Sequence, residues 1–129
     1  MNYWLMKSEP GTYSWGDLKR DRATLWDGVR NYQARNNMKL MAVGDQVLFY
    51  HSGADKEVVG VMEIKSPAAE DPADKNFVVL KVAPLRELKA PITLKQIKAD
   101  PLLVKMEFVR QSRLSVSKVS AEEFEKFSV

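Results

Sequence analysis

Three strand-like segments follow one another so closely that they limit the folds open to this chain. They are QVLFYH at residues 46–51, EVVGVMEI at 57–64 and NFVVLKVA at 76–83. The spacers between them are too short for the helical crossover that joins neighbouring parallel strands. The segments should therefore pair antiparallel, and the first two should form a hairpin closed by the polar loop SGADK.

Shorter elements are expected on both sides of this antiparallel unit. The segments at residues 2–7 and 113–119 read as an opening and a late strand. Helix starts are indicated by residues whose side chains can accept a hydrogen bond from a free N–H group of the first turn. The predicted caps are Ser14 with Asp17, Asn31, Thr93 with Gln96, and Ser120 with Glu123. The chain therefore mixes strands with short helices, as α+β folds do.

Two glycines and one proline-containing segment indicate where the backbone turns, bulges or forms a loop. Gly44 is expected to end the helix that Asn31 begins, in a left-handed turn. Gly60 lies inside the second segment, which indicates a bulge or the close approach of another group. Residues 66–75, SPAAEDPADK, are acidic and contain two prolines, so we expect an exposed loop there.

The 129 residues show no shift in composition that would divide them, so we expect one domain over residues 1–129. Short strands with peripheral helices favour a small, mostly antiparallel barrel or curled sheet. No segment reaches the roughly 18 apolar residues of a membrane span, and the first ten residues do not resemble a signal peptide. We therefore expect a cytoplasmic protein that does not act on a membrane.

The sequence lacks the residues that several kinds of metal site and active site require. The chain has no cysteine and a single histidine, His51, which excludes thiolate sites and most zinc sites. It also lacks a glycine-rich phosphate loop and a GxSxG elbow. We expect no metal, no cofactor and no catalysis. A hydrolase in which His51 is the base, Ser8, Ser52 or Ser115 the nucleophile and Glu9 the orienting group stays an alternative, although no spacing singles these residues out.

Aromatic and polar side chains in the first fifty residues suit recognition of a planar ligand. The segment WDGVRNYQARN at 26–36 places a tryptophan beside a DG turn, with two arginines and three side-chain amides. Aromatic rings stack on nucleobases, arginines hold phosphates, and amides hydrogen-bond the edges of bases. Trp26 is therefore a candidate pocket wall. Trp4 is expected in the core, and Trp15 is expected either to pack or to form a surface plate.

Positive charge is concentrated in one part of the chain. Residues 81–118 contain nine Lys or Arg against three acidic residues, although the net charge of the whole chain is only +3. Such a stretch attracts polyanions such as nucleic acid. The alternative is a lysine-rich surface that is simply solvated.

Four blocks of sequence resemble the signature of the EVE domain family, in order along nearly the whole chain. They are WLMKSEP at 4–10, WDGVRNYQARN at 26–36, GDQVLFYHS at 44–52 and VRQSRLSV at 109–116. The resemblance implies a PUA-like fold, a small curled β-barrel with flanking short helices, related to the YTH domains that hold a methylated adenine in an aromatic cage. It also implies binding of nucleic acid, DNA or RNA, and the reading of a modified base, above all a modified cytosine.

The resemblance also places the ligand site. We expect Trp26 to stack on a flipped base, Ser8 and Asn31 to bond its Watson–Crick edge, and arginines to hold the flanking phosphates. A nuclease or another effector, encoded separately, is a candidate partner. The candidate ligand-binding residues are Lys7, Ser8, Glu9, Trp26, Val29, Arg30, Asn31, Arg35, Tyr50, His51, Ser52, Arg113 and Ser115.

One position departs from the pattern that the resemblance implies. Many members have a longer acidic, proline-rich loop and then a tryptophan that opens the third strand, where this chain has Phe77. Phenylalanine keeps a stacking face but lacks the indole N–H donor. A ligand contact at Phe77 would change specificity, whereas a core position, which we expect, would not. A protein-interaction module with exposed aromatic side chains stays a third alternative.

Overall fold

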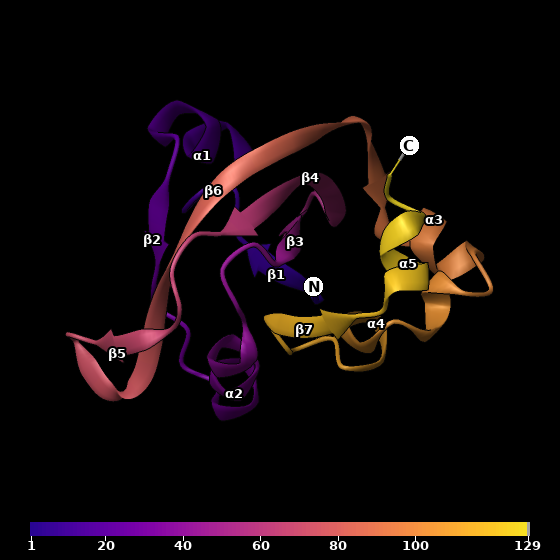
Figure 1. The fold of residues 1–129 in the computed structure, drawn as a ribbon. Helices are drawn as coiled ribbons and strands as arrows, with labels where there is room; N and C mark the ends of the chain where they lie inside the picture. The colour runs from indigo at the N-terminus through magenta and orange to yellow at the C-terminus, as the bar shows by residue number, and fades with distance from the viewer. Residues whose placement is uncertain (129) are drawn as a thin grey trace.

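The computed structural model describes residues 1–128, and a strongly curled sheet lies at its centre (Figure 1). Its strands are β1 (Tyr3–Ser8), β2 (Thr24–Trp26), β3 (Gln46–His51), β4 (Glu57–Ile64), β5 (Ala69–Asp71), β6 (Asp74–Thr93) and β7 (Val116–Val119). The helices are α1 (Trp15–Asp21), α2 (Tyr32–Leu40), α3 (Leu94–Ala99), α4 (Glu107–Arg110) and α5 (Ala121–Glu125), with a 3-10 turn, η1 (Leu103–Lys105).

The strands are ordered β2-β6-β4-β3-β1-β7, and β5 pairs with β6 beside this path. The β3–β4 hairpin and the β4–β6 pair are antiparallel, which confirms the sequence prediction. The opening strand β1 instead pairs parallel with β3 and antiparallel with β7. The sheet thus curls into a half-barrel whose two edges, β2 and β7, are not joined by a ladder within residues 1–128. The α+β, PUA-like architecture expected from the sequence is confirmed.

Strand β6 is far longer than the predicted segment, and it arches over the whole molecule (Figure 1). It continues past two prolines, Pro84 and Pro91. Pro84 lies opposite Met62, beside an irregularity between Val61 and Met62 in the pairing with β4, and proline is tolerated at bulges because the ladder is already interrupted there. Residues 66–75 are not wholly a loop, because β5 folds back on the start of β6.

Helix starts follow the predicted caps. The side chains of Ser14, Thr93 and Ser120 each accept from the N–H group three residues on in a complete capping box, and Asn31 caps α2. The prediction for Gly44 was wrong. Helix α2 ends at Leu40, and Gly44, with φ +96°, instead forms the turn that leads into β3.

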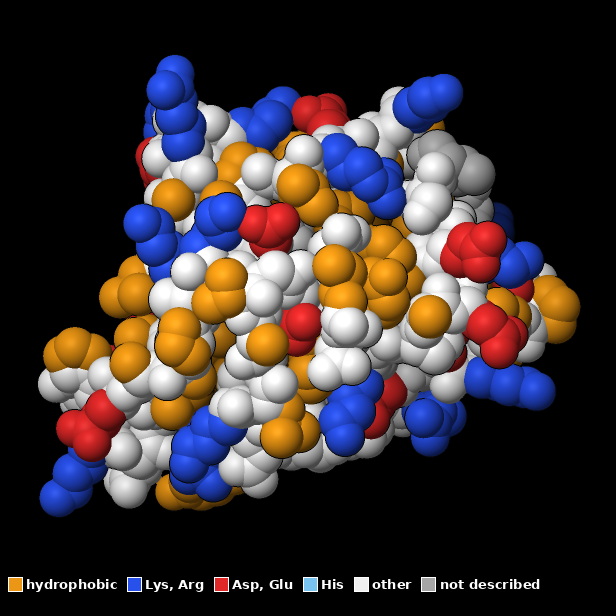
Figure 2. Space-filling view, viewed as in Figure 1, with side chains coloured by type: hydrophobic (Ala, Val, Ile, Leu, Met, Phe, Trp, Pro, Cys, Tyr) orange, Lys and Arg blue, Asp and Glu red, His pale blue; other side chains and the backbone are white. Residues whose placement is uncertain are grey.

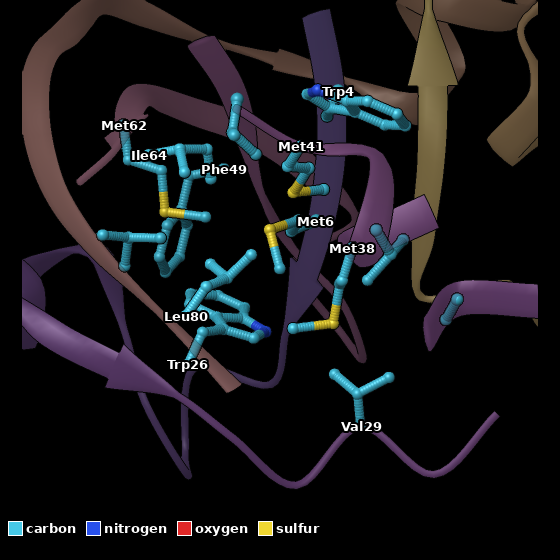
Figure 3. Close-up of a cluster of buried hydrophobic side chains, with 14 of the residues drawn as sticks. Trp4, Met6, Trp26, Val29, Met38, Met41, Phe49, Met62, Ile64 and Leu80 are labelled. Carbon is cyan, nitrogen blue, oxygen red and sulfur yellow. The ribbon is translucent and has the colours of Figure 1, made fainter. Parts of the chain in front are cut away.

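Side chains alternate between the two faces of the sheet, and each face carries its own core. The first cluster includes Trp4, Met6, Trp26 and Phe49, and Figure 3 shows it with Trp4 at its upper edge. The second cluster lies on the other face and is covered by α3, α4 and α5. It includes Leu5, Leu48, Tyr50, Ile97, Phe108 and Phe127.

The three tryptophans are all buried, as Trp4 was predicted to be. Trp15 packs rather than forming a surface plate, and its ring lies against Gly60, so that a Cβ atom at Gly60 would fall 2.5 Å from the ring. The pairing of β3 with β4 also shifts register at this point, between Phe49 and Tyr50. Gly60 therefore marks both a bulge and a close approach. Phe77 is buried as well.

The outer surface mixes charges of both signs. On the face shown in Figure 2, lysine and arginine side chains are scattered, with acidic side chains between them, so the described part of this face does not form one basic patch. Within residues 1–128, every helix is too short or too polar to cross a lipid bilayer.

Candidate functional site

A cavity of about 510 Å³ opens on the side where the half-barrel is not closed. Edge strand β2 forms one wall, the turn that follows β1 forms another, and the chain just before β7 completes it. We call this cavity the Trp26 pocket. It is lined by Lys7, Ser8, Glu9, Thr12, Tyr13, Thr24, Leu25, Trp26, Asp27, Gly28, Val29, Arg30 and Ser115.

Trp26 forms the apolar floor of this pocket rather than a free wall. Only 8% of its surface is exposed, and its ring meets the ring of Phe49 edge to face at 5.6 Å. Figure 3 shows it pointing into the core beside Leu80. Residues 27–30 after it form neither a turn nor a bend, but Gly28 has a φ of +77° that few other residues adopt. A ligand in the pocket would therefore touch only a small part of the Trp26 ring.

The polar rim is fixed by backbone hydrogen bonds. The carbonyl of Glu9 accepts from the N–H groups of Thr12 and Tyr13, both at 2.9 Å, which folds the chain after β1 into a tight turn. The Ser8 hydroxyl donates to the carbonyl of Tyr13 across that turn. The N–H of Lys7 donates to the carbonyl of Ser115 at 2.9 Å. These bonds hold hydroxyl groups, carbonyls and one lysine around a mostly apolar floor.

Arg30 lines the pocket, but its guanidinium is held by neighbours outside it. Its guanidinium bonds one Asp71 carboxylate oxygen at 3.0 Å and lies 5.2 Å from the centre of the Phe77 ring. The hydrogen bond from the Ala73 N–H, together with Arg30, holds the pKa of Asp71 below its usual range. Arg30 therefore reaches a bound anion only by leaving or sharing this ion pair.

A row of alternating cations and rings continues from Arg30. The Phe77 ring stacks on Tyr32 at 5.2 Å, and the guanidinium of Arg35 lies 4.7 Å from the Tyr32 ring. Arg35 also donates to the carbonyl of Asn76 at 2.9 Å. Phe77 thus joins the β6 strand to α2. The geometry explains why an aromatic residue suits this position and does not require a ligand contact.

The structure distributes the thirteen predicted site residues over several places. Seven line the Trp26 pocket: Lys7, Ser8, Glu9, Trp26, Val29, Arg30 and Ser115. Tyr50 and Ser52 line a different cavity, which Lys7 also reaches. Asn31 and Arg113 line a shallow hollow beside Arg110. The side-chain oxygen Oδ1 of Asn31 is already occupied, because it accepts from the Ala34 N–H at 2.9 Å as the cap of α2. Arg35 and His51 line none of these three cavities.

His51 holds the fold together instead of serving a pocket. Its Nε2 atom accepts from the backbone N–H of Trp15 at 3.0 Å, and its Nδ1 atom lies 3.4 Å from the Asp55 carboxylate. The lone pair that a general base would use is therefore engaged by the start of α1. Within residues 1–128, no hydrogen bond joins His51 to Ser8, Ser52 or Ser115. This geometry disfavours the hydrolase alternative.

Replacing His51 by alanine should lower the free energy of unfolding by about 1–3 kcal/mol, because the Trp15 N–H loses its acceptor in a half-buried place. Urea unfolding followed by circular dichroism measures this. Asp55→Ala is the control and should cost less, because the Asp55 side chain is exposed. A hydrolytic turnover that His51→Ala abolishes while stability is unchanged would contradict the structural role.

Six residues of the Trp26 pocket were missed from the sequence: Thr12, Tyr13, Thr24, Leu25, Asp27 and Gly28. The DG turn was the available signal for Asp27 and Gly28. The short edge strand β2 has no alternation long enough to predict, so Thr24 and Leu25 carried no signal. Within residues 1–128, no group of three His, Asp or Glu side chains is gathered closely enough to hold a metal ion.

Comparison with known proteins gives consistent matches over the whole chain. The model of the EVE domain family matches residues 2–128. Thymocyte nuclear protein 1 of Mus musculus is 36% identical over 161 aligned residues, which cover 96% of this chain and 71% of that protein. A crystal structure of an Agrobacterium tumefaciens protein has a TM-score of 0.94 at 40% identity, covering 98% of this chain and 90% of that chain. The human THYN1 protein in complex with DNA containing 5-methylcytosine has a TM-score of 0.89 at 30% identity, covering 98% and 95%.

Proposed function

This chain belongs to the EVE domain family, and on that premise we propose that it binds nucleic acid and holds one modified base, a methylated cytosine in the first instance, in the Trp26 pocket. The proposal is not an enzymatic one. The observation that carries it is a cavity of about 510 Å³ with an apolar floor and a polar rim, in a fold shared with a human protein crystallised with DNA that contains 5-methylcytosine.

The pocket has the size and lining that a flipped base needs. Sites for small planar ligands have volumes of roughly 300–1,000 Å³ and combine apolar walls with a few placed polar groups. Trp26 and Val29 offer apolar surface, which suits the methyl group that distinguishes 5-methylcytosine. The hydroxyls of Thr12, Thr24 and Ser115 line the same cavity.

Charges at the rim suit the edge of cytosine. The exocyclic amine of cytosine is a hydrogen-bond donor, and carboxylate or carbonyl oxygens accept from it. Glu9 and Asp27 both line the pocket and are exposed at its rim. Lys7 lies at the other end and supplies a donor for a carbonyl oxygen or a phosphate. The base would thus be read by its edge and its methyl group, while the tryptophan forms the floor beneath it.

The test is fluorescence-anisotropy binding of matched single- and double-stranded oligonucleotides that contain cytosine, 5-methylcytosine or 5-hydroxymethylcytosine, at two salt concentrations. Wild-type protein should prefer one modified base, and its affinity should fall with salt. Ser115→Trp places a ring in the pocket and should abolish the preference and weaken binding by about 10-fold or more, since one stacked base contributes roughly 1–3 kcal/mol.

Ser115→Ala is the matched control, because it changes the same residue and leaves the cavity open. It should bind within about 3-fold of wild type, the loss expected for one hydroxyl. Thermal unfolding of both variants shows whether the fold is kept. Salt-sensitive binding that ignores the modification in wild type would leave only a polyanion-binding surface. No binding to any oligonucleotide would favour a protein partner.

A further inference from the structure

A second cavity lies on the opposite face of the β1–β3 pair from the Trp26 pocket. It has a volume of about 350 Å³ and is enclosed by the ends of β1 and β3, the turn at residues 52–56, α3 and α4. We call it the lysine pocket. Its polar lining is made by Lys7, Tyr50, Ser52, Lys56, Lys98 and Ser112. The pocket thus collects cations from three separate parts of the chain.

The three lysines of this pocket form no ion pair within the described part of the protein. No carboxylate lines the pocket, and within residues 1–128 neither Lys7, Lys56 nor Lys98 takes part in an ion pair. The Glu9 carboxylate, which lines the Trp26 pocket, lies against Gly53 at the border of the lysine pocket and pairs with none of the three lysines. Three ammonium groups around one hollow repel one another, and a bound anion removes that repulsion.

A tyrosine hydroxyl in this pocket also lacks a partner from the described part of the protein. Tyr50 is only 4% exposed, and its ring packs against Phe108 at 5.2 Å. No described residue bonds its hydroxyl, and because the hydroxyl oxygen is not itself among the buried unpartnered atoms, it is open to the cavity that Tyr50 lines. Burial raises the pKa of Tyr50, so the hydroxyl keeps its proton and is a donor. Tyr50 therefore offers a hydrogen bond to an acceptor inside the cavity.

Lys7 connects the lysine pocket with the Trp26 pocket, because its side chain lines both. Its Nζ atom donates to the carbonyl of Ser112 at 2.8 Å and lies 5.7 Å from the centre of the Phe108 ring. Burial lowers the pKa of Lys7, which a nearby anion would reverse. The ammonium group has donors to spare, since it carries three.

From the uncompensated lysines, the unpartnered Tyr50 hydroxyl and the enclosing cavity, we propose that the lysine pocket binds a phosphate group. Lysines supply the charge and Tyr50 with Ser52 supplies directed hydrogen bonds. Two sources fit this chemistry, a backbone phosphate of a bound strand or a free phosphate group. Binding of a backbone phosphate from a nucleic-acid strand rests on the proposed function, because Lys7 would then lie between the held base and that phosphate. The phosphate site itself does not depend on it.

The first experiment titrates inorganic phosphate into ¹⁵N-labelled protein at constant ionic strength and follows amide chemical shifts. Saturable changes should be confined to residues 50–56, α3 and α4. Lys98→Ala should weaken phosphate binding by about 10-fold, as the loss of one charge-assisted hydrogen bond predicts. Tyr50→Phe should weaken it by about 5-fold at unchanged charge. Lys95→Ala removes the same charge from the same helix without lining the pocket, and should change binding by less than about 2-fold.

The second experiment repeats oligonucleotide binding with the two lysine variants. If a strand supplies the phosphate, Lys98→Ala should reduce the slope of log affinity against log salt by about one, and Lys95→Ala should not. Localised phosphate shifts with oligonucleotide affinity equal in both variants would assign the site to a free phosphate group. Absence of all oligonucleotide binding would refute the proposed function and leave the phosphate titration to decide. Shifts spread over all lysines, or equal effects of Lys95→Ala and Lys98→Ala on phosphate, would overturn the proposal.

Discussion

Replacing Gly60 by valine is expected to lower the free energy of unfolding by about 3 kcal/mol or more, at the upper end of the cost of overpacking a core. A Cβ atom at Gly60 would lie 2.5 Å from Cζ2 and 2.6 Å from Cε2 of Trp15. The ring cannot simply swing away. It meets Phe49 edge to face at 5.4 Å, and its Nε1 donates to the Glu87 carboxylate at 3.3 Å.

Urea unfolding followed by circular dichroism gives the measurement, and Gly16→Ala is the matched control. A Cβ atom at Gly16 would lie 3.5 Å from the Ser14 hydroxyl oxygen, an ordinary contact. Because Gly16 is within α1, alanine there should leave stability unchanged or raise it by up to about 1 kcal/mol. A Gly60→Val protein as stable as wild type would show that Trp15 is not fixed against β4.

Features set by residues two to four apart could be predicted from the sequence. The caps at Ser14, Thr93 and Ser120 need only one side chain and the N–H group three residues on. The β3–β4 hairpin follows from two short apolar runs with a polar loop between them. The same local logic failed at Gly44, because a glycine with positive φ serves a turn into a strand as readily as the end of a helix.

Features set by distant contacts could not be predicted in this way. The parallel pairing of β1 with β3 brings Tyr3 beside Gln46, and no pattern in either segment specifies it. Strand β6 continues past Pro84 because its partner strand shifts register there. The bulge depends on two strands together, so the sequence of β6 alone did not indicate where the strand would end.

The candidate site also depends on distant contacts that the sequence does not specify. The resemblance placed Tyr50, His51 and Ser52, which are consecutive in the sequence, together among the ligand-binding residues. Successive residues of a strand point to opposite faces of a sheet, so Tyr50 joins the lysine pocket while His51 faces Trp15. A short block can thus place some residues in a cavity and others in a structural contact, and only the sheet decides which residue does which.

Replacing Asp45 by alanine should lower the free energy of unfolding by about 3–5 kcal/mol at neutral pH, through loss of charge-assisted hydrogen bonds to buried donors. Asp45 is 3% exposed. One carboxylate oxygen accepts from the N–H of Asn2 at 3.1 Å, and the other accepts from the Trp4 indole and the Ala42 N–H, both at 3.0 Å. The carboxylate therefore joins the start of β1 to the turn before β3.

The dependence of this effect on pH separates the charge of Asp45 from its shape. Burial alone would raise the pKa of Asp45, but hydrogen bonds from Ala42, Trp4 and Asn2 outweigh it and hold that pKa below its usual range. A carboxyl group with a lowered pKa stabilises the folded state above its ordinary pKa of about 3.9, and that contribution is lost as pH falls through the folded-state pKa. Asp45→Asn keeps the shape and cannot titrate, so its stability deficit should shrink as pH falls below about 4.

Urea unfolding of wild type and Asp45→Asn at pH 7 and pH 3 measures the change in that deficit. The pKa values of Asp17, Asp71 and Asp100 are also lowered, so both proteins should lose stability in acid for reasons unrelated to Asp45. Those contributions are common to the pair and cancel in the difference, because sites distant from one another act additively. A deficit that stays constant from pH 7 to pH 3 would mean that Asp45 acts by its shape alone, and that its charge does not hold β1 to the turn before β3.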